Sequence, residues 1–316
     1  MDQCLKHFPV TLFASVMGMT GLAIAYMRFA QWYGVAEIIG KGLAVFSFAL
    51  FLAISVTYTA KYIVHRDEVR KEFQHPIRAN FFPAISISLL LLAVVSLDFY
   101  RSFAQVLWAT GALLQLIFTV IIISRWIARS FEITHSNPTW FIPVVGTIIV
   151  PIAGVEFADR ELLWFFYSVG VFFWLALFAI IFYRLIFHPQ LPQKFVPTLF
   201  ILIAPPALGC IAYMKLTGTF DIAARILLYI ALFFVLLLGS MARYFISLKF
   251  FVSWWAYTFP LCGATIATIV AAKAASSAAL SVIATALLVV TSAVIAVVFA
   301  KTVSALYNRK LCEAEE

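Results

Sequence analysis

The chain consists of long, nearly uninterrupted apolar runs separated by short polar segments. A helix needs about 20 apolar residues to cross a bilayer, and ten runs reach or approach that length. None has the alternating pattern of an outer-membrane β-strand, so helices are the expected spanning structure. We therefore predict an all-α membrane protein with ten transmembrane helices, in which residues 1–316 form a single integral membrane domain. The ten runs cover residues 9–31, 36–63, 80–98, 102–124, 139–156, 161–183, 196–215, 221–246, 250–272 and 278–300.

Proline divides the ten predicted helices into two alternating kinds. The even-numbered helices contain no proline, and the interior prolines all fall in odd-numbered helices. A proline inside a helix removes a backbone hydrogen bond and kinks the helix. A membrane protein tolerates such a break where neighbouring helices bury it or where it lines a cavity. The interior prolines are Pro83, Pro143, Pro151, Pro205, Pro206 and Pro260.

This alternation predicts five helical hairpins, each with one interrupted inner helix and one regular outer helix. The hairpins start near residues 9, 80, 139, 196 and 251, a spacing of 55 to 71 residues that resembles a degenerate repeat. Five odd-numbered inner helices inside five outer helices would enclose a central pore. This path is the functional candidate.

Composition and charge support a membrane protein and exclude a soluble one. Apolar residues make up 64% of the chain and charged residues 11%, and the mean hydropathy is +1.03. The net charge is +8, but the chain has no run of basic residues that could follow the phosphates of a nucleic acid. We therefore expect no nucleic-acid partner. Of the 22 lysines and arginines, 15 fall at the predicted helix ends that share a side with both termini. We therefore expect a multi-pass protein of the cell (inner) membrane with both termini in the cytoplasm.

The predicted helices have almost no ionisable side chains. Residues 102–124, 162–183, 250–272 and 274–300 contain no Asp, Glu, Lys, Arg or His. Proton-driven and cation-selective mechanisms usually place such groups inside the membrane, so both are disfavoured. An intramembrane enzyme would need a His, Asp or Cys constellation that is missing here, and no CxxC pair suggests a metal. We expect no enzymatic activity, no cofactor and no metal site.

The inner helices instead offer hydroxyl groups and small residues. Hydroxyls that donate weakly to an anion would suit passive anion passage limited by the cost of dehydration. The same residue types also pack helices closely together in lipid, and the sequence leaves both interpretations open. These residues are Ser15, Gly18, Thr20, Gly21, Ser86, Ser88, Gly146, Thr147, Gly209, Thr258, Gly263, Thr265 and Thr268.

The ninth predicted helix has the most distinctive local pattern, which reads Ser253-Trp254-Trp255-Ala256-Tyr257-Thr258-Phe259-Pro260. Phe259 is followed on the same helix face by small residues spaced four apart. This face would therefore carry one large ring and, beyond it, only small side chains. If that face lines the path, Phe259 obstructs it and Pro260 allows it to move. Simple packing of Phe259 is the alternative. Besides this gate, the candidates for pore lining or kinks are Gly18, Pro83, Pro143, Gly146, Pro205, Pro206, Thr258, Pro260 and Gly263.

Four short stretches resemble the tellurite-resistance/dicarboxylate transporter family, which includes the slow-type anion channels of plant guard cells. Their order and the ten-helix hairpin layout are similar to that family across nearly the whole chain. The stretches are Glu72-Phe73-Gln74-His75-Pro76-Ile77-Arg78, Asn137-Pro138-Thr139-Trp140-Phe141-Ile142-Pro143, the run from Pro197 to Pro206, and the run from Trp254 to Pro260.

The resemblance implies a homotrimer in which each subunit has its own pore, formed by the five odd-numbered helices. It also implies that a phenylalanine of the ninth helix blocks the pore near mid-membrane, and the matching position is Phe259. Anion selectivity without a tight binding site follows from the same resemblance. The plant members carry long cytosolic tails for kinase control, which this sequence does not match.

The sequence therefore predicts a passive anion channel that is gated by Phe259 and selects anions, such as chloride, by their dehydration cost. The alternative is a carrier for C4-dicarboxylates or small oxyanions such as tellurite, which would use the same path by alternating access. In either case the expected partners are small inorganic or organic anions and the lipid bilayer.

Overall fold

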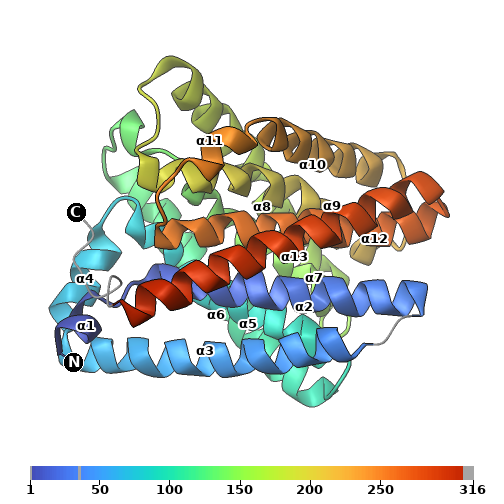
Figure 1. The fold of residues 1–316 in the computed structure, drawn as a ribbon, viewed down its shortest axis with the longest axis horizontal. Helices are drawn as coiled ribbons and strands as arrows, with labels where there is room; N and C mark the ends of the chain where they lie inside the picture. Colours follow the sequence, from blue (N-terminus) through green and yellow to red (C-terminus); the bar gives the residue numbers. More distant parts are fainter. Residues whose placement is uncertain (1, 35–36, 309–316) are drawn as a thin grey trace.

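The computed structural model describes residues 2–34 and 37–308, and this part of the chain contains helices and no strand. The predicted all-α membrane fold is confirmed (Figure 1). Five helices form the interior and are called the inner helices: α2 (Phe13–Tyr33), α5 (Pro83–Ser96), α7 (Phe141–Gly154), α9 (Ala204–Thr217) and α12 (Thr258–Ala275). Each is followed by an outer helix: α3 (Ile38–Val64), α6 (Arg101–Ala128), α8 (Arg160–Phe187), α10 (Ile222–Ser240) and α13 (Ala278–Tyr307).

The inner and outer helices differ strongly in burial. In four of the inner spans, 78% to 89% of the most apolar stretch is buried, whereas in the five outer spans the share is 22% to 33%. α7 is equally enclosed, because Ile142 is its only residue that is not buried. The outer helices turn many apolar side chains outward, as a surface in contact with lipid requires. The predicted division into inner and outer helices is therefore confirmed.

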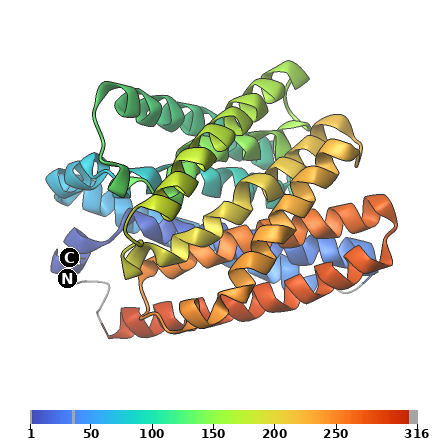
Figure 2. The same cartoon turned by 90° about the horizontal axis from the view of Figure 1, so that it is seen from above.

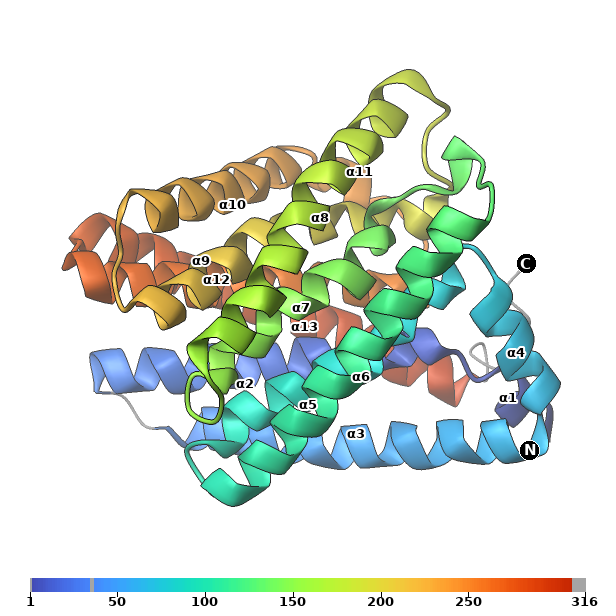
Figure 3. The same cartoon turned by 180° about the vertical axis from the view of Figure 1, so that it is seen from behind.

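Contacts between the inner helices close a ring in the order α2, α5, α7, α9, α12 and back to α2. Each outer helix packs on the inner helix before it and also contacts the next inner helix. The outer helices therefore fill the grooves between neighbouring inner helices (Figure 2). Figure 3 shows α6 and α8 lying over α5 and α7 in this way.

The number of long spans differs from the sequence prediction. Nine helices in the described residues are long and apolar enough to cross a membrane, and the tenth segment, Pro138–Gly154, is shorter. Its three 3-10 residues and 14 α-helical residues give it a length of roughly 27 Å, close to the ~30 Å of a hydrocarbon core. Neighbouring helices enclose this segment, so its short length exposes no backbone to lipid.

A segment of 3-10 helix stands at the amino-terminal end of every inner helix. The tighter 3-10 winding keeps the backbone hydrogen-bonded, which a buried segment in a membrane requires. No outer helix has such an extension in the described residues. The segments are η1 (Val10–Leu12), η2 (Arg78–Phe81), η4 (Pro138–Trp140), η5 (Gln193–Ile203) and η6 (Val252–Tyr257).

The prolines mark these 3-10 to α transitions rather than kinks in helix interiors. Pro83 and the Pro205-Pro206 pair occupy the first turn of α5 and α9. Pro143 and Pro260 are each the third residue of their α-helices. A proline at the start of an α-helix removes at most a hydrogen bond to the preceding 3-10 turn and leaves the rest of the α-helical hydrogen bonds intact. Only Pro151 lies inside an inner α-helix, near its end.

All five inner helices begin at the same end of the bundle, called the N face below, and the opposite end is called the C face. The N face also carries the short helices of the chain (Figure 1). At the C face, three outer helices begin at capping side chains, because Asp159, Asp221 and Ser277 accept hydrogen bonds from the first free N–H groups. The short helices of the N face are α1 (Asp2–His7), α4 (Arg66–Gln74), η3 (Ile133–His135) and α11 (Ala242–Ile246).

The contact between α2 and α12 depends on Gly18, and this gives a test of the packing. A Cβ atom at Gly18 would overlap the side chain of Thr258 and lie 3.3 Å from Trp255. We predict that Gly18→Ala lowers the free energy of unfolding in detergent by about 1–3 kcal/mol, because the buried helices cannot separate without losing contacts. The matched control is Gly263→Ala on α12, where the nearest atom would be 3.6 Å away. Equal unfolding temperatures for the two variants would contradict the prediction.

Candidate functional site

A narrow cavity lies between the five inner helices, and every one of them contributes to its wall. It has a volume of about 50 Å³, which is room for only a few water molecules. All the residues that line it are apolar or glycine, among them Met17 of α2, Ala84 of α5, Val145 of α7, Leu208 of α9 and Phe259 of α12. The cavity lies where the 3-10 segments pass into the α-helices.

Aromatic rings from several inner helices narrow this cavity. Phe81 comes from the end of η2, Phe141 from the start of α7, and Trp255 and Phe259 from the η6–α12 transition. Phe259 is 7% exposed, and it packs toward Gly21 of α2, where a Cβ atom would lie 3.5 Å from its ring. Phe259 therefore borders the cavity together with three other aromatic rings.

Of the residues predicted to line a path, three border the cavity: Phe259, Gly146 and Pro260. Gly18 and Thr258 instead fill the contact between α2 and α12. Gly263, Pro83, Pro143, Pro205 and Pro206 are buried among the helices but do not border the cavity.

Sequence reasoning missed Phe81 and Phe141, although the chain contains a signal for both. Phe81 stands two residues before Pro83, Phe141 stands two residues before Pro143, and Phe259 directly precedes Pro260. A ring just before a proline thus recurs in three inner helices at the 3-10 to α transition. The same spacing also occurs at Phe82, Phe187 and Phe195, which do not border the cavity, so it narrows the choice among the 32 phenylalanines without deciding it.

The hydroxyl groups of the inner helices do not line the cavity as one interpretation of the sequence expected. Each has a backbone carbonyl of its own helix or helix start as a hydrogen-bond acceptor, and Ser86 also reaches Oε1 of Gln115 at 2.7 Å. Their protons are therefore used within the protein and are not free to be donated to an anion at the same time. Close packing of the helices accounts for these residues. Thr20 is the exception, because its buried hydroxyl has no hydrogen-bond partner. The hydroxyls that donate to carbonyls belong to Ser15, Ser86, Ser88, Thr147, Thr258, Thr265 and Thr268.

Comparison with known proteins adds a family to this geometry. A family model named SLAC1 and described as voltage-dependent anion channel matches residues 7–303, which include every inner helix and its 3-10 segment. The chain belongs to the SLAC1 family. This agrees with the resemblance seen in the sequence motifs. It also places the chain in a family of channels and transporters rather than of enzymes.

The relatives of this SLAC1-family chain come from plants, archaea and bacteria. The S-type anion channel SLAH3 of Arabidopsis thaliana is 34% identical over 84% of this chain and 43% of the plant protein. An uncharacterized transporter of Methanocaldococcus jannaschii is 29% identical over 84% of this chain and 83% of its own length. The tellurite resistance protein TehA homolog of Haemophilus influenzae is 24% identical over 81% of this chain and 79% of its own length. The chain thus spans less than half of the plant channel.

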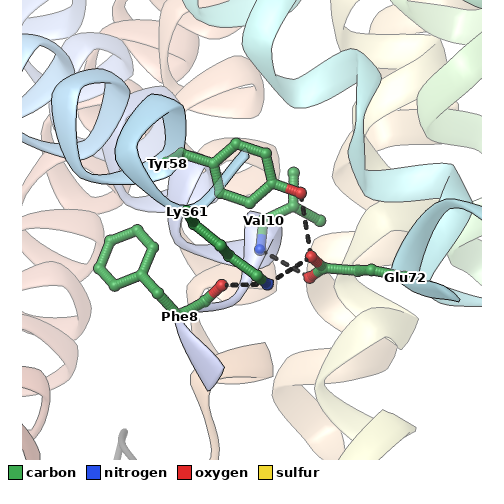
Figure 4. A network of polar contacts seen from close by, with 5 residues as sticks. All are labelled: Phe8, Val10, Tyr58, Lys61 and Glu72. Carbon is green, nitrogen blue, oxygen red and sulfur yellow. Dashed lines mark hydrogen bonds and ion pairs between the residues drawn. The ribbon is translucent and has the colours of Figure 1, made fainter. Parts of the chain in front are cut away.

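A buried ion pair at the N face ties the beginning of the SLAC1-family chain to α3 and α4 (Figure 4). Glu72 Oε1 accepts a hydrogen bond from the backbone N–H of Val10 at 2.9 Å. Glu72 Oε2 accepts from the hydroxyl of Tyr58 at 2.9 Å and from Lys61 Nζ at 2.8 Å. Lys61 Nζ also donates to the carbonyl of Phe8 at 2.7 Å. The network therefore fixes the start of η1, from which α2 leads to the cavity.

No local sequence pattern predicts this ion pair. Lys61 and Glu72 lie at the ends of a predicted span and of a polar motif, where exposed charges are common. In the structure their side chains are only 4% and 6% exposed. The pair forms because the turn after α3 folds α4 back onto the N face, and the sequence around Lys61 and Glu72 does not predict this turn.

The imidazole of His75 organises the turn that leads into η2. Its Nδ1 accepts hydrogen bonds from the backbone N–H groups of Ile77 at 3.1 Å and Arg78 at 3.2 Å, so this nitrogen carries no proton. Partial burial and the positive charges of Arg78, Lys194 and His135 lower the pKa of His75. Protonation of Nδ1 would break both hydrogen bonds at the start of η2.

Removing one partner of the buried ion pair should be costly. We predict that Glu72→Ala lowers the free energy of unfolding by about 3–5 kcal/mol, because it leaves the Lys61 charge buried without an acceptor. Glu72→Gln should lose less, since it keeps one acceptor. Glu68→Ala on the same helix is the control, because Glu68 pairs with the exposed Lys71 and should change little. Unfolding temperatures in detergent would decide, and similar losses for Glu68→Ala and Glu72→Ala would refute the prediction.

The lowered pKa of His75 predicts a pH dependence of stability. The unfolded chain takes up a proton on this histidine near pH 6.5, while the folded chain resists protonation to a lower pH. The stability contributed by neutral His75 is therefore present above pH 6.5 and is lost progressively as the pH falls below it. In His75→Asn, an amide oxygen can replace Nδ1 as acceptor, so its unfolding temperature should fall less between pH 7.5 and pH 5. Equal slopes for the two proteins would contradict this role.

Proposed function

We propose that this chain is a passive anion channel whose conducting path runs between the five inner helices. The observation that carries the proposal is the cavity at the 3-10 to α transition of all five helices, because it has a wholly apolar wall and three phenylalanine rings. An ion in this position would have to leave most of its water behind. A hydrophobic constriction of this kind blocks conduction by dewetting until its walls separate.

The charge distribution favours anions over cations along this path. The inner helices are parallel, so their dipoles all place partial positive charge at the N face. Exposed basic side chains at the same end, such as Arg66, Arg70, Arg129 and Arg243, add to this potential. The cavity wall itself has no cation. Anions are thus attracted to the mouth but are not held tightly at the constriction.

Selection among anions then follows from the cost of removing water. Weakly hydrated anions such as nitrate lose less on entering an apolar constriction than chloride does, so they should pass more easily. A carrier for C4-dicarboxylates or for small oxyanions such as tellurite is the alternative. It would need a fixed site for its substrate, and no cation borders the described cavity that could bind a dicarboxylate.

The proposed setting is the inner membrane, with the N face toward the cytoplasm. The excess of lysine and arginine at this face supports the orientation. The homotrimer implied by the family resemblance stays a prediction. Chemical cross-linking of the protein in native membranes would test it by the size of the largest product.

The proposed gate can be tested by removing its ring. We predict that Phe259→Ala increases anion current about tenfold or more, because lowering the barrier by about 1.4 kcal/mol gives this factor. Currents would be recorded in bilayers that contain purified wild type or variant, with chloride, nitrate and malate exchanged in turn. Phe166→Ala is the control, since Phe166 is buried on α8 away from the cavity.

Two outcomes would count against this proposal. Unchanged current in a folded Phe259→Ala variant would remove Phe259 from the gate, and Phe81→Ala and Phe141→Ala would then be measured. Saturable, proton-dependent uptake without any current would replace the channel by the carrier.

A further inference from the structure

A second cavity lies at the N face, away from the path between the inner helices. It is formed by the turn between α4 and η2 on one side and by the end of α6 and the segment up to η3 on the other. Its volume is about 350 Å³, which falls in the range of sites for small molecules. It shares no lining residue with the central cavity. This space is called the N-face pocket below.

Half of the residues that line the N-face pocket are basic or aromatic. Arg125, Arg129, His75 and His135 contribute basic groups, while Glu132 is the acidic residue of the lining. Partial burial, followed by the charges of Arg78, Lys194 and His135, lowers the pKa of His75, and His135 is the one of these cations that lines the pocket. A concave, positively charged site of this size suits a small multivalent anion.

Arg125 is held in position to receive such an anion. Its Nη1 donates to the carbonyl of Phe73 at 2.8 Å, and the guanidinium lies 4.0 Å from the centre of the Phe73 ring. A fixed guanidinium loses little freedom when it binds, and its fork of N–H donors matches the oxygens of a phosphate. His75 uses Nδ1 as an acceptor, so its Nε2–H is the donor left to the ring.

We propose that the N-face pocket is a binding site for a phosphate group, either free phosphate or the phosphate of a lipid headgroup. Arg125 and Arg129 would bind the phosphate oxygens, with His75 as a further donor. A halide that passes through the central path would fill only a small part of this pocket. The arginine fork and the volume therefore favour an oxyanion over the permeating ion.

The pocket also contacts the elements that carry the constriction. Ala79 and Asn80 of η2 line the pocket, and the next residue, Phe81, lines the central cavity. Trp126 lines the pocket and stacks on Trp140, with ring centres 4.9 Å apart. The residue after Trp140 is Phe141, which also lines the central cavity. A bound phosphate would thus restrain both η2 and η4, and this second part of the inference rests on the proposed channel function.

Binding can be measured on the full-length chain in detergent without reference to transport. Isothermal titration at constant ionic strength would use inorganic phosphate in one arm and dioctanoyl phosphatidic acid in the other. We expect saturable binding in at least one arm, and the arm that binds identifies the source of the phosphate. Arg125→Gln and Arg129→Gln should each weaken it about tenfold, the effect of losing one charge-assisted hydrogen bond. Arg243→Gln is the control, because Arg243 is exposed at the N face outside the pocket.

Absence of saturable binding in both arms would overturn the site. Binding that Arg129→Gln leaves unchanged would overturn it too, and this exposed position lets the test stand even if Arg125→Gln fails to fold. The regulatory part is tested by wild-type anion current with and without the phosphate ligand. Confirmed binding with measurable but unchanged current would reject regulation alone, whereas absence of any current would speak against the channel and leave the binding result intact.

Discussion

The need to satisfy every backbone hydrogen bond away from water is the constraint on which this structure depends. In lipid, an irregular segment would leave N–H and C=O groups without partners, so each crossing must be helical. The inner helices meet this requirement with two kinds of helix, a 3-10 segment at the N face and an α-helix beyond it. The outer helices shield the transitions from lipid, which lets prolines stand at the start of the inner α-helices.

The same constraint explains why polar side chains are used as they are. Hydroxyls of the inner helices bond to carbonyls of their own chain, and this leaves an apolar wall around the central cavity. The buried ion pair of Lys61 and Glu72 lies at the N face, where it also forms hydrogen bonds with the backbone of Phe8 and Val10. The buried charges therefore lie at the N face, and the aromatic rings border the central cavity. In the proposed channel, an anion attracted to the N face would meet its main barrier at the cavity.

The motif from Glu72 to Arg78 shows how one short stretch serves several purposes. Glu72 anchors the start of the first inner helix, Phe73 positions Arg125, and His75 orders the entrance to η2. Because η2 ends in Phe81, this stretch is connected through the backbone to the wall of the central cavity. The span matched by the SLAC1 family model includes all of these residues.

The sequence by itself determined the fold class, the hairpin order and the distinction between inner and outer helices, because long apolar runs and proline positions are local properties. It also pointed to Phe259, Gly146 and Pro260, which do border the central cavity. Only the tertiary structure decided that Phe81 and Phe141 share this cavity, that Gly18 and Thr258 pack against each other, and that the hydroxyls face carbonyls. Lys61 and Glu72 likewise became a buried pair only when α4 folded back on α3. Each of these outcomes depends on which helix faces match across the ring, and a side chain's direction relative to distant helices is not encoded in its neighbours along the chain.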